Sequence, residues 1–431
     1  MTMVKPRGDF SFENLEITDL NGNVITLSNF AKVDNAWLSY DGTDRFQLFS
    51  MLETCIKSGS NIFFASPNIS QALKMEILTY LEDNFPLRKS FLGFLTSGSS
   101  GHQKLIVHSI DSLFYSALAL IEKYPALRNG RYLHCFPTYY MAGVLNLAIV
   151  PLVAQGSITL SNSFGPLEIL SFGNILQKFE ITNLWINPGM LNSLVERYHN
   201  QNIRNTLNLV LNATGPITET KRNKFNSIFN CSVLNTYGLT ELLFVSGEEQ
   251  AREKITIGNP LSLCEIRLDK EVLVVRTATT PLEIVLIDEI NSAKGTSKYS
   301  FATQLLKSEF YTNDICQVNS DGTHFILGRN DDVVLLGGLN ISLSRIERAA
   351  ENFSGVIAAC ARLSYAENKP EIQLIIELGK NETAFELNSF KSELKIILEP
   401  FEFPSKIFIG KLPKLPSGKI DRQRVRKIGD F

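Results

Sequence analysis

Between residues 90 and 260, short apolar runs alternate with amphipathic stretches, and this alternation limits the possible folds more than any other feature. The apolar runs are rich in β-formers and end at loops containing Gly, Pro, Ser and Asn; they are Phe91–Thr96, Tyr132–Phe136, Asn183–Ile186, Leu207–Asn212 and Val233–Thr236. The stretches Ser109–Tyr124 and Met190–Tyr198 have helical spacing. The pattern predicts an α/β fold whose layered sheet carries ligand loops at its strand ends.

The chain changes character after residue 262. Short strand-like segments and turns from about 262 to 330 predict a small β-rich subdomain of a large N-terminal domain, residues 1–330. From Asp331 onward, two strands, two helices and a last strand predict a small C-terminal α/β domain, residues 331–431. A length of 431 residues agrees with two or three subdomains.

Composition excludes several classes of protein. The net charge of -2 argues against a nucleic-acid partner. Six cysteines without a C-x-x-C pair argue against a disulfide framework or a zinc site, and favour a reducing compartment. The first residues lack a secretion signal, and the longest apolar run, Tyr140–Ala154, is too short and too interrupted to span a membrane. We expect a soluble cytoplasmic protein; the oligomeric state stays open.

The segment Thr96–Lys104, TSGSSGHQK, follows an apolar strand and suits a polyphosphate. Small residues let backbone N–H groups approach phosphate oxygens, hydroxyl groups donate to them, and Lys104 adds charge. It is not a Walker A loop, because His102 and Gln103 separate the glycine from the lysine. Taken alone, the segment is equally compatible with a surface turn. The expected nucleotide-binding residues are Thr96, Ser97, Gly98, Ser99, Ser100 and Gly101.

Three further motifs carry charges suited to a nucleotide. In Tyr237–Glu241, YGLTE, the carboxylate of Glu241 could hold a Mg²⁺ ion that neutralises pyrophosphate. Asp314, in YTND, could accept hydrogen bonds from both ribose hydroxyls, and Arg329, in GRNDD, could contact ribose or phosphate. Each motif also has an ordinary interpretation: a solvated acid after a strand, or a surface ion pair.

The segment Gly418–Arg422, GKIDR, places Lys419 in a basic C-terminal stretch. The last thirty-one residues hold eight Lys or Arg against three acids, so a solvated basic tail is the alternative interpretation. A lysine on a movable loop could lie between two reacting anions and then withdraw.

These five motifs, in this order, resemble the adenylate-forming superfamily of acyl- and aryl-CoA ligases, luciferases and peptide-synthetase adenylation domains. The resemblance covers residues 91 to 427. The chain is similar to short forms among o-succinylbenzoate-CoA ligases and aryl acid:carrier-protein ligases. It implies catalytic roles for Lys419, Thr240, Glu241 and Lys104, with Glu241 on Mg²⁺. It also implies ATP contacts from Tyr237, Gly238, Asp314 and Arg329, with Tyr237 stacked on adenine.

The resemblance further implies a mobile C-terminal domain with its hinge at Asp331. Gly337 and Gly338 would border the tunnel for the thiol of CoA or of a carrier-protein phosphopantetheine. The acid pocket is expected at Tyr139, Tyr140, Gly143, Gly215 and Asn235, although the aromatic residues could simply pack in the core.

The sequence departs from the family pattern at three positions and in its N-terminal part. Gln103 replaces a usual proline, Asn313 a frequent glycine and Tyr140 a frequent histidine, and the portion before Thr96 is short. Asn tolerates positive φ, so the turn at Asn313 can persist.

We therefore expect an ATP-dependent ligase that activates a carboxylic acid, aryl or aryl-like, as acyl-AMP and transfers it to a thiol. The alternatives are an o-succinylbenzoate-CoA ligase of menaquinone biosynthesis, a conventional NTPase and a non-catalytic nucleotide-binding homologue.

Overall fold

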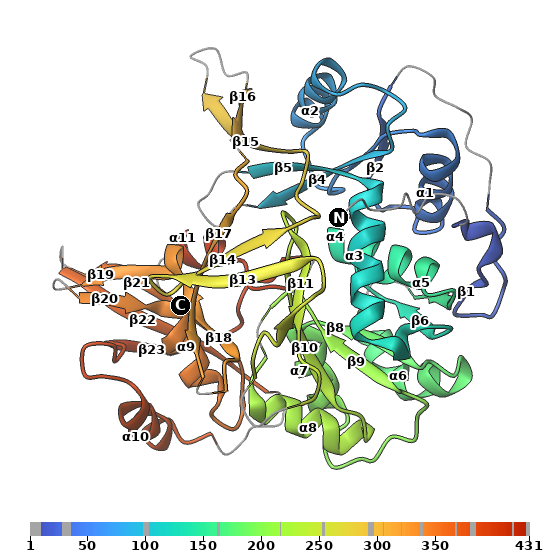
Figure 1. The fold of residues 1–431 in the computed structure, drawn as a ribbon. Coiled ribbons are helices and arrows are strands. Elements are labelled where there is room, and N and C mark those ends of the chain that lie inside the picture. Colours follow the sequence, from blue (N-terminus) through green and yellow to red (C-terminus); the bar gives the residue numbers. More distant parts are fainter. Residues whose placement is uncertain are drawn as a thin grey trace.

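The computed structural model describes residues 10–27, 36–97, 103–161, 164–215, 217–251, 255–291, 297–304, 306–319, 321–336, 339–366, 369–379, 385–415 and 418–427. The N-terminal portion of the chain forms the right-hand side of Figure 1, and the C-terminal strands and helices lie together on the left. No helix among these described residues is both long and apolar enough to cross a membrane.

The largest sheet has eight strands in the order β1-β7-β6-β8-β9-β10-β11-β12. Its strands are β1 (Ile17–Asp19), β6 (Arg131–His134), β7 (Ser157–Leu160), β8 (Asn183–Ile186), β9 (Leu209–Asn212), β10 (Val233–Leu239), β11 (Leu243–Gly247) and β12 (Asn259–Pro260). The strands from β1 to β10 pair in parallel. Because parallel strands need crossovers, helices separate them in sequence, as the alternating pattern predicts.

Helices cover this sheet, and three of those described begin at a side-chain cap. The helices are η3 (Pro125–Leu127), α3 (Ile110–Lys123), α4 (Met141–Val144), η4 (Leu145–Ile149), α5 (Val150–Val153), α6 (Pro166–Lys178), α7 (Pro188–Arg197) and α8 (Glu219–Phe229). The three with a side-chain cap are α3, α7 and α8. Ser109 Oγ accepts the N–H of Ser112, and Thr218 Oγ1 accepts the N–H of Lys221. The apolar run Tyr140–Ala154 forms the buried helical segment α4–η4–α5, whose middle turn is π-helical.

A second sheet of six strands contains the two strands that flank the predicted phosphate loop. Its order is β16-β15-β5-β4-β3-β2, with β2 (Leu38–Tyr40), β3 (Ile62–Phe64), β4 (Phe91–Ser97), β5 (Gln103–Ser109), β15 (Glu283–Asn291) and β16 (Ser297–Gln304). The remaining N-terminal elements are η2 (Phe12–Asn14), α1 (Gln47–Ser58) and α2 (Gln71–Asn84).

This sheet differs from the sequence-based expectation in two respects. Phe91–Thr96 lies in a different sheet from the other four predicted strands, because β4 forms an antiparallel pair with β5. β15, expected in the β-rich subdomain, pairs with β5 instead. Its Val285 and Ile287 join a core cluster with Phe63 and Leu105 of the six-stranded sheet, so burial of these apolar side chains determines the pairing.

The other strands lie between and beyond these sheets. A four-stranded sheet contains β13 (Cys264–Asp269), β14 (Val272–Thr277), β17 (Phe310–Val318) and β18 (His324–Arg329). The C-terminal portion consists of η5 (Asn330–Asp332), β19 (Val333–Leu336), β20 (Leu339–Ser342), α9 (Leu343–Glu351), β21 (Val356–Ala366), β22 (Lys369–Leu378), α10 (Leu387–Ile397), β23 (Lys406–Ile409) and α11 (Arg422–Lys427).

The C-terminal portion has an apolar core of its own. Residues from Ile341 to Leu398 form a cluster separate from the large cluster of the eight-stranded sheet. The domain boundary that we predict at Asn330–Asp331 falls in η5, between these two cores.

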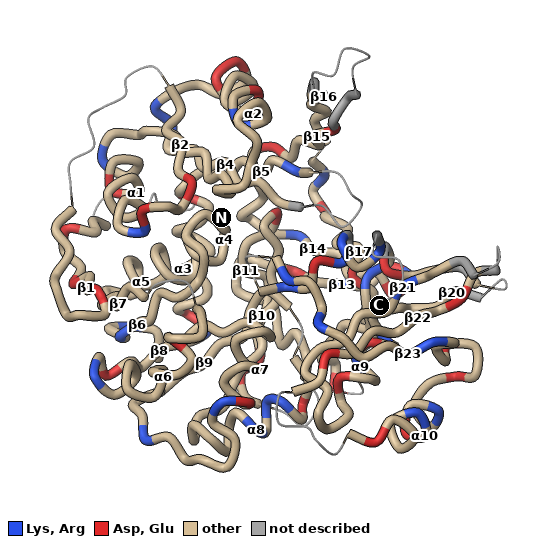
Figure 2. The backbone as a smooth tube through the Cα atoms, turned by 180° about the vertical axis from the view of Figure 1, so that it is seen from behind, with Lys and Arg blue, Asp and Glu red and all other residues tan. Residues whose placement is uncertain are grey.

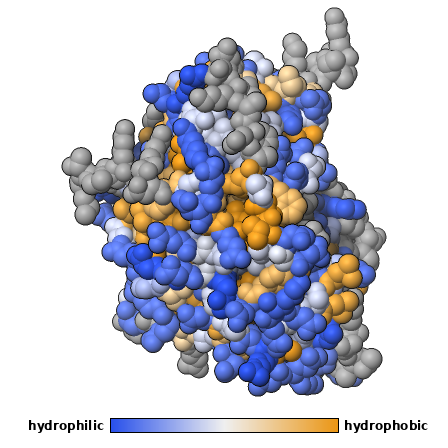
Figure 3. Space-filling view, turned by 90° about the vertical axis from the view of Figure 1, so that its right-hand side faces the viewer, coloured by the Kyte–Doolittle hydropathy of each residue, from blue (hydrophilic) through white to orange (hydrophobic). Residues whose placement is uncertain are grey.

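Lys and Arg positions are interspersed with Asp and Glu along the chain (Figure 2), as the small net charge leads us to expect. The face at the right of Figure 1 is largely polar, with an apolar area near its middle (Figure 3).

Candidate active site

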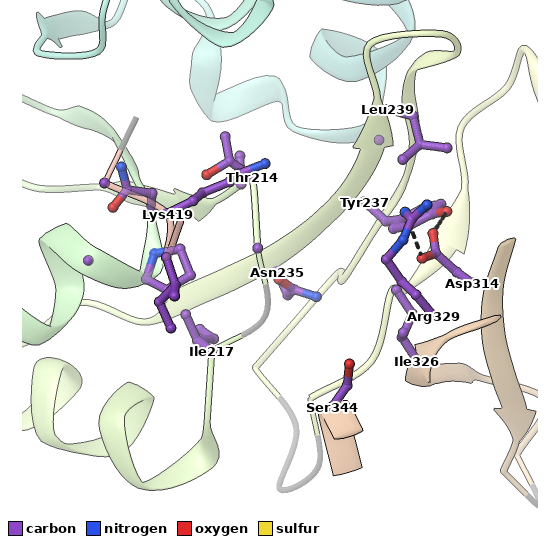
Figure 4. Close-up of a pocket in the computed structure, with 18 of the residues that line it drawn as sticks. Thr214, Ile217, Asn235, Tyr237, Leu239, Asp314, Ile326, Arg329, Ser344 and Lys419 are labelled. Carbon is purple, nitrogen blue, oxygen red and sulfur yellow. Dashed lines mark hydrogen bonds and ion pairs between the residues drawn. The ribbon is translucent and has the colours of Figure 1, made fainter. Parts of the chain in front are cut away.

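A cavity of about 1280 Å³ lies at the carboxyl ends of β8, β9 and β10, and residues of the C-terminal portion also line it. The carboxyl ends of parallel strands are the usual place for a ligand in an α/β sheet. Figure 4 shows Tyr237, Asp314 and Arg329 together on one side of this cavity and Lys419 beside Thr214 on the other, with Asn235 between them.

Three predicted nucleotide residues form a connected cluster. The hydroxyl of Tyr237 donates to the carboxylate of Asp314, and Arg329 Nη1 lies 3.3 Å from Asp314 Oδ1. Burial, reinforced by the charge of Asp314, raises the pKa of Tyr237, so its hydroxyl stays protonated as a donor. Asn313 has φ +64°, the left-handed conformation that we expected it to tolerate. The cluster offers a carboxylate, positioned by two partners, to the cavity.

Lys104 and Glu241 bring opposite charges from two sheets into the cavity. Lys104 Nζ lies 3.4 Å from Glu241 Oε1, and Lys104 pairs across the strands with Thr96 at the ends of β5 and β4. Thr96 and Thr240 line the cavity with them. No cluster of three or more His, Cys, Asp or Glu side chains suited to a metal occurs within the described ranges. One carboxylate nevertheless fits Mg²⁺, because this ion commonly takes its remaining ligands from substrate phosphates and water.

Some of the predicted site residues lie outside the part of the chain that the structure describes. Gly98, Ser99, Ser100, Gly101, Gly337 and Gly338 lie outside the described residues, and the side chains of Ser97 and Asp331 are not described either.

Lys419 lies on a tight turn whose backbone is hydrogen-bonded to itself. The N–H of Leu415 donates to the carbonyl of Lys419 at 2.8 Å, and the N–H of Gly418 donates to that of Leu415 at 2.8 Å. Gly418 has φ +81°, and a Cβ on Gly189, in the first turn of α7, would lie only 3.2 Å from the Gly418 carbonyl oxygen. The turn therefore packs closely on the helix that follows β8.

The environment of Lys419 is that of a charge inside a cavity. Its side chain remains open to the cavity, but the surrounding protein walls remove it from bulk water and lower its pKa. Repulsion by Arg329 acts in the same direction, and attraction by Glu241 opposes it. Lys419, Arg329 and Glu241, separated by almost two hundred residues in sequence, thus influence one another electrostatically in one site.

Two helices of the large domain contact the first strand of the C-terminal sheet and support this arrangement. Asn192 Nδ2 donates to the carbonyl of Ile357 at 2.6 Å, and Lys221 Nζ donates to the same oxygen at 2.9 Å. Lys221 also lies 3.6 Å from Glu351. These contacts join α7 and α8 to α9 and β21, and any withdrawal of Lys419 by movement of the C-terminal portion would break them.

Arg422 of the GKIDR motif has a structural partner that sequence reasoning did not identify. Its guanidinium group forms a two-pronged contact with Glu347 of α9, one prong of which measures 2.6 Å. Arg426 and Ser344 approach the carboxylate of Asp332 at 3.4 and 3.1 Å. These contacts attach α11, and with it the Lys419 turn, to the segment that follows the predicted hinge.

The residues predicted for the acid pocket divide into two groups. Gly215 and Asn235 line the cavity, whereas Tyr139, Tyr140 and Gly143 do not. Tyr139 and Tyr140 contact each other, with ring centroids 4.5 Å apart. The cavity wall in this region comes instead from the adjoining helical segment, through Met141, Ala142, Leu145 and Asn146. The sequence motif predicts which segment lies beside the cavity. It does not predict which side chains of that segment line the cavity.

The amide of Asn235 is already engaged by the protein. Its Nδ2 donates to the carbonyl of Thr256 at 2.8 Å, and its Oδ1 accepts from Asn212 at 2.8 Å. Its backbone N–H donates to Glu248 at 2.8 Å. Asn235 therefore holds the wall of the cavity in place, because its amide nitrogen and its amide oxygen each already have a protein partner.

A buried chain of contacts behind the predicted acid-pocket segment was also missed by sequence reasoning. Arg45 Nη2 donates to the Phe136 carbonyl at 3.0 Å and lies 3.1 Å from His134 Nδ1, and His134 Nε2 lies 3.0 Å from the Gly143 carbonyl. Burial holds the pKa of His134 well below its usual range, so the ring stays neutral and donates from Nε2. Arg45 is some ninety residues away in sequence, and no local pattern connects it to this segment.

His108 of β5 contacts the backbone of the Tyr237–Glu241 segment. From its buried position we predict that the stability of the protein depends on pH. His108 Nε2 lies 2.7 Å from the Thr240 carbonyl, and burial lowers the pKa of this ring to about 4. In the unfolded chain the ring binds a proton below about pH 6.5. The free energy of unfolding should therefore fall as the pH drops from about 6.5 to about 4, because only the unfolded state gains the proton.

At pH 5 the expected contribution of His108 to this loss is about 2 kcal/mol relative to pH 7. His108→Gln keeps a donor for the Thr240 carbonyl but cannot titrate, so its urea midpoint should change less between pH 7 and pH 5 than that of the unmodified chain. Equal changes in the two proteins would contradict this assignment.

Comparison with known proteins identifies the fold around this cavity. Residues 90–278 match the sequence profile of the family described as AMP-binding enzyme. The similarity to this family covers the strands and helices that surround the cavity, from β4 to β14. The predicted resemblance to adenylate-forming enzymes is thereby confirmed.

Relatives extend the similarity over most of the chain. A malonate–CoA ligase of Arabidopsis thaliana is 22% identical over 88% of this chain and 68% of its own. A 2-succinylbenzoate–CoA ligase of Bacillus cytotoxicus is 23% identical over 81% of this chain and 72% of its own. The structure of an anthranilate CoA ligase in complex with anthranoyl-AMP has a TM-score of 0.72 and 16% identity, and covers 90% of this chain and 86% of that one.

Proposed function

We propose that this chain is an AMP-forming acid–thiol ligase. A carboxylic acid, aryl or aryl-like, would react with ATP to give an acyl-adenylate and pyrophosphate, and a thiol would then displace AMP. The observation that carries the proposal is the convergence of Lys419, Glu241 and the Asp314–Arg329 pair on one cavity. A carboxylate and a triphosphate repel each other, so their reaction needs a cation held between them.

The nucleotide would be held at the Asp314 side of the cavity. The Asp314 carboxylate can accept a hydrogen bond from each ribose hydroxyl, and Arg329 and the Tyr237 hydroxyl hold that carboxylate in place. The triphosphate would then point toward Thr96, Thr240 and Lys104, where the charges of two sheets meet. A Mg²⁺ ion beside Glu241 would supply positive charge to the leaving pyrophosphate.

Lys419 would join the two reactants. The substrate carboxylate oxygen attacks the α-phosphorus, and the bond from that phosphorus to the bridging oxygen of pyrophosphate breaks. A protonated Lys419 would contact both the attacking carboxylate and the α-phosphate, and so lower the cost of bringing two anions together. In the second step a thiolate sulfur attacks the acyl carbonyl carbon and AMP leaves. The thiol would belong to CoA or to a carrier-protein phosphopantetheine.

Two further proposals concern the setting of the enzyme. None of the six cysteines, all of which the structure describes, forms a disulfide, and this suits a cytoplasmic location. Rotation of the C-terminal portion about Asp331 would withdraw Lys419 and admit the thiol, and it would break the contacts that Asn192 and Lys221 make with Ile357.

A 2-succinylbenzoate ligase is a second candidate function, because relatives of that name match most of the chain.

Acid-dependent exchange of labelled pyrophosphate into ATP tests the proposal. We expect exchange with at least one member of a panel of benzoates, cinnamates, 2-succinylbenzoate and fatty acids, and none without an acid. A non-catalytic homologue would bind ATP yet remain silent with every acid, and a conventional NTPase would release ADP and phosphate without exchange.

A further inference from the structure

The end of the cavity near the helical segment after β6 has a distinctive composition. Met141 and Leu145 give it apolar walls, and Asn146 is its polar member on that segment. Asn146 is only 4% exposed, and its side chain lines the cavity. Within the part of the chain that the structure describes, no residue hydrogen-bonds to its amide, whose atoms are not among the fully buried ones. A buried amide without a protein partner costs free energy unless a ligand or water satisfies it.

The position of Asn146 in the fold supports a role in binding. It lies in η4, the π-helical turn between α4 and α5. A π-helical turn is uncommon and is found frequently at functional sites. Asn235, the amide that we predicted for this wall, already donates to Thr256 and accepts from Asn212. Asn146 is therefore the better candidate for direct contact with an acid substrate.

The strand order indicates which part of the ligand reaches Asn146. Tyr237 and Thr240 follow β10, and β9, β8 and β6 come next across the sheet. Three strand spacings separate β10 from β6, roughly 15 Å. The nucleotide occupies the β10 side in the proposed function, and the Lys419 turn packs on α7 after β8. The acyl part of the substrate would extend from Lys419 toward the segment after β6.

Charge limits what this end of the cavity can bind. Every cationic side chain that the described part of the cavity offers comes from β5, β18 or the C-terminal portion. The segments that follow β6, β8 and β9 contribute neutral side chains and two acids, Glu196 and Glu219. Lys419 is occupied by the reacting carboxylate, so a second carboxylate near Asn146 would lose its hydration without gaining a cation.

We infer that the substrate is a monocarboxylic acid with an apolar body and a neutral hydrogen-bonding substituent, which pairs with the amide of Asn146. This inference rests on the proposed function and deepens it, because it names the substrate class. Dicarboxylic acids are poor substrates on the same grounds, and 2-succinylbenzoate is one of them, so this inference opposes the second candidate function. Asn146 then determines specificity, since a site that leaves a buried amide unpaired discriminates strongly against an acid that lacks the substituent.

The test uses sets of acids that share one carbon skeleton. Benzoic, cinnamic and hexanoic acids are each compared in unsubstituted form, with one hydroxyl and with a second carboxylate, by pyrophosphate exchange with the full chain. On the skeleton that the enzyme accepts, the hydroxylated acid should react fastest and the dicarboxylate slowest. In Asn146→Leu, the ratio of kcat/KM for the hydroxylated over the unsubstituted acid should fall about tenfold or more. In Asn146→Lys, kcat/KM for the dicarboxylate should rise relative to kcat/KM for the hydroxylated and the unsubstituted acid, because a cation then faces the second carboxylate.

The outcomes separate this inference from the function on which it rests. Absence of exchange with every acid overturns both. Exchange that is fastest with a dicarboxylate overturns the inference alone, as does an unchanged ratio in Asn146→Leu. Thermal unfolding of both variants, compared with the unmodified chain, shows that any change in ratio does not reflect loss of the fold.

Discussion

Lys419→Ala should slow acyl-adenylate formation by roughly 100-fold or more, the scale on which one preorganised charge contributes to catalysis. Alanine removes the cation that the structure places in the cavity with Glu241 and Arg329. The change in rate should appear in kcat for pyrophosphate exchange, because Asp314 and Arg329 still bind the nucleotide. Thioester formation from supplied acyl-adenylate should be affected far less.

A lysine elsewhere in the C-terminal portion provides the matched control. Lys391 of α10 does not line the cavity, so Lys391→Ala should leave both half-reactions at the rate of the unmodified chain. Equal losses in the two half-reactions of Lys419→Ala would show that Lys419 does not act in adenylation alone, and the proposed withdrawal of its turn would be wrong.

Glu248→Leu should destabilise the large domain by about 3–5 kcal/mol, the usual cost of removing one partner from a buried ion pair. Arg222 Nη1 and Glu248 Oε2 lie 2.9 Å apart, and both side chains are only 1% exposed. Glu248 also accepts the backbone N–H groups of Asn235 and Thr256, so the substitution leaves these buried donors without their acceptor. Urea unfolding of the two proteins measures the difference.

An exposed ion pair of similar geometry serves as the control. Arg267 and Glu309 lie 2.6 Å apart, but both side chains are more than a third exposed. Glu309→Ala should therefore cost no more than about 1 kcal/mol. Similar losses in Glu248→Leu and Glu309→Ala would mean that burial does not set the strength of the Arg222–Glu248 pair.

Local patterns predicted much of the fold. The strands β6, β8, β9 and β10 coincide closely with apolar runs bounded by loops, and helices such as α3 and α9 begin at serine caps, Ser109 and Ser342. Sheet membership was less predictable, because it depends on contacts between distant segments. β15 has the composition of a strand in either sheet, and only its packing against β5 assigns it to the six-stranded one.

In the candidate site, too, local motifs predicted some residues, whereas others depend on contacts between distant segments. Motifs identify Lys104, Glu241, Asp314, Arg329 and Lys419 as a group, because their chemistry is legible in short stretches, and the structure brings them to one cavity. Asn235 was predicted for the acid pocket in this way, but Asn146 was not. The contacts of Asn235 with Thr256 and Asn212, and the place of Asn146 in a π-helical turn, depend on the folded structure and not on neighbouring sequence.

The measurement that tests the central claim most directly is the stoichiometry of products when the chain is incubated with ATP, Mg²⁺, CoA and the acid that supports exchange. The account predicts one AMP and one pyrophosphate for each acyl thioester formed, with none of the three in the absence of acid. Release of ADP and phosphate, or AMP formation that does not depend on the acid, would contradict an adenylate-forming ligase.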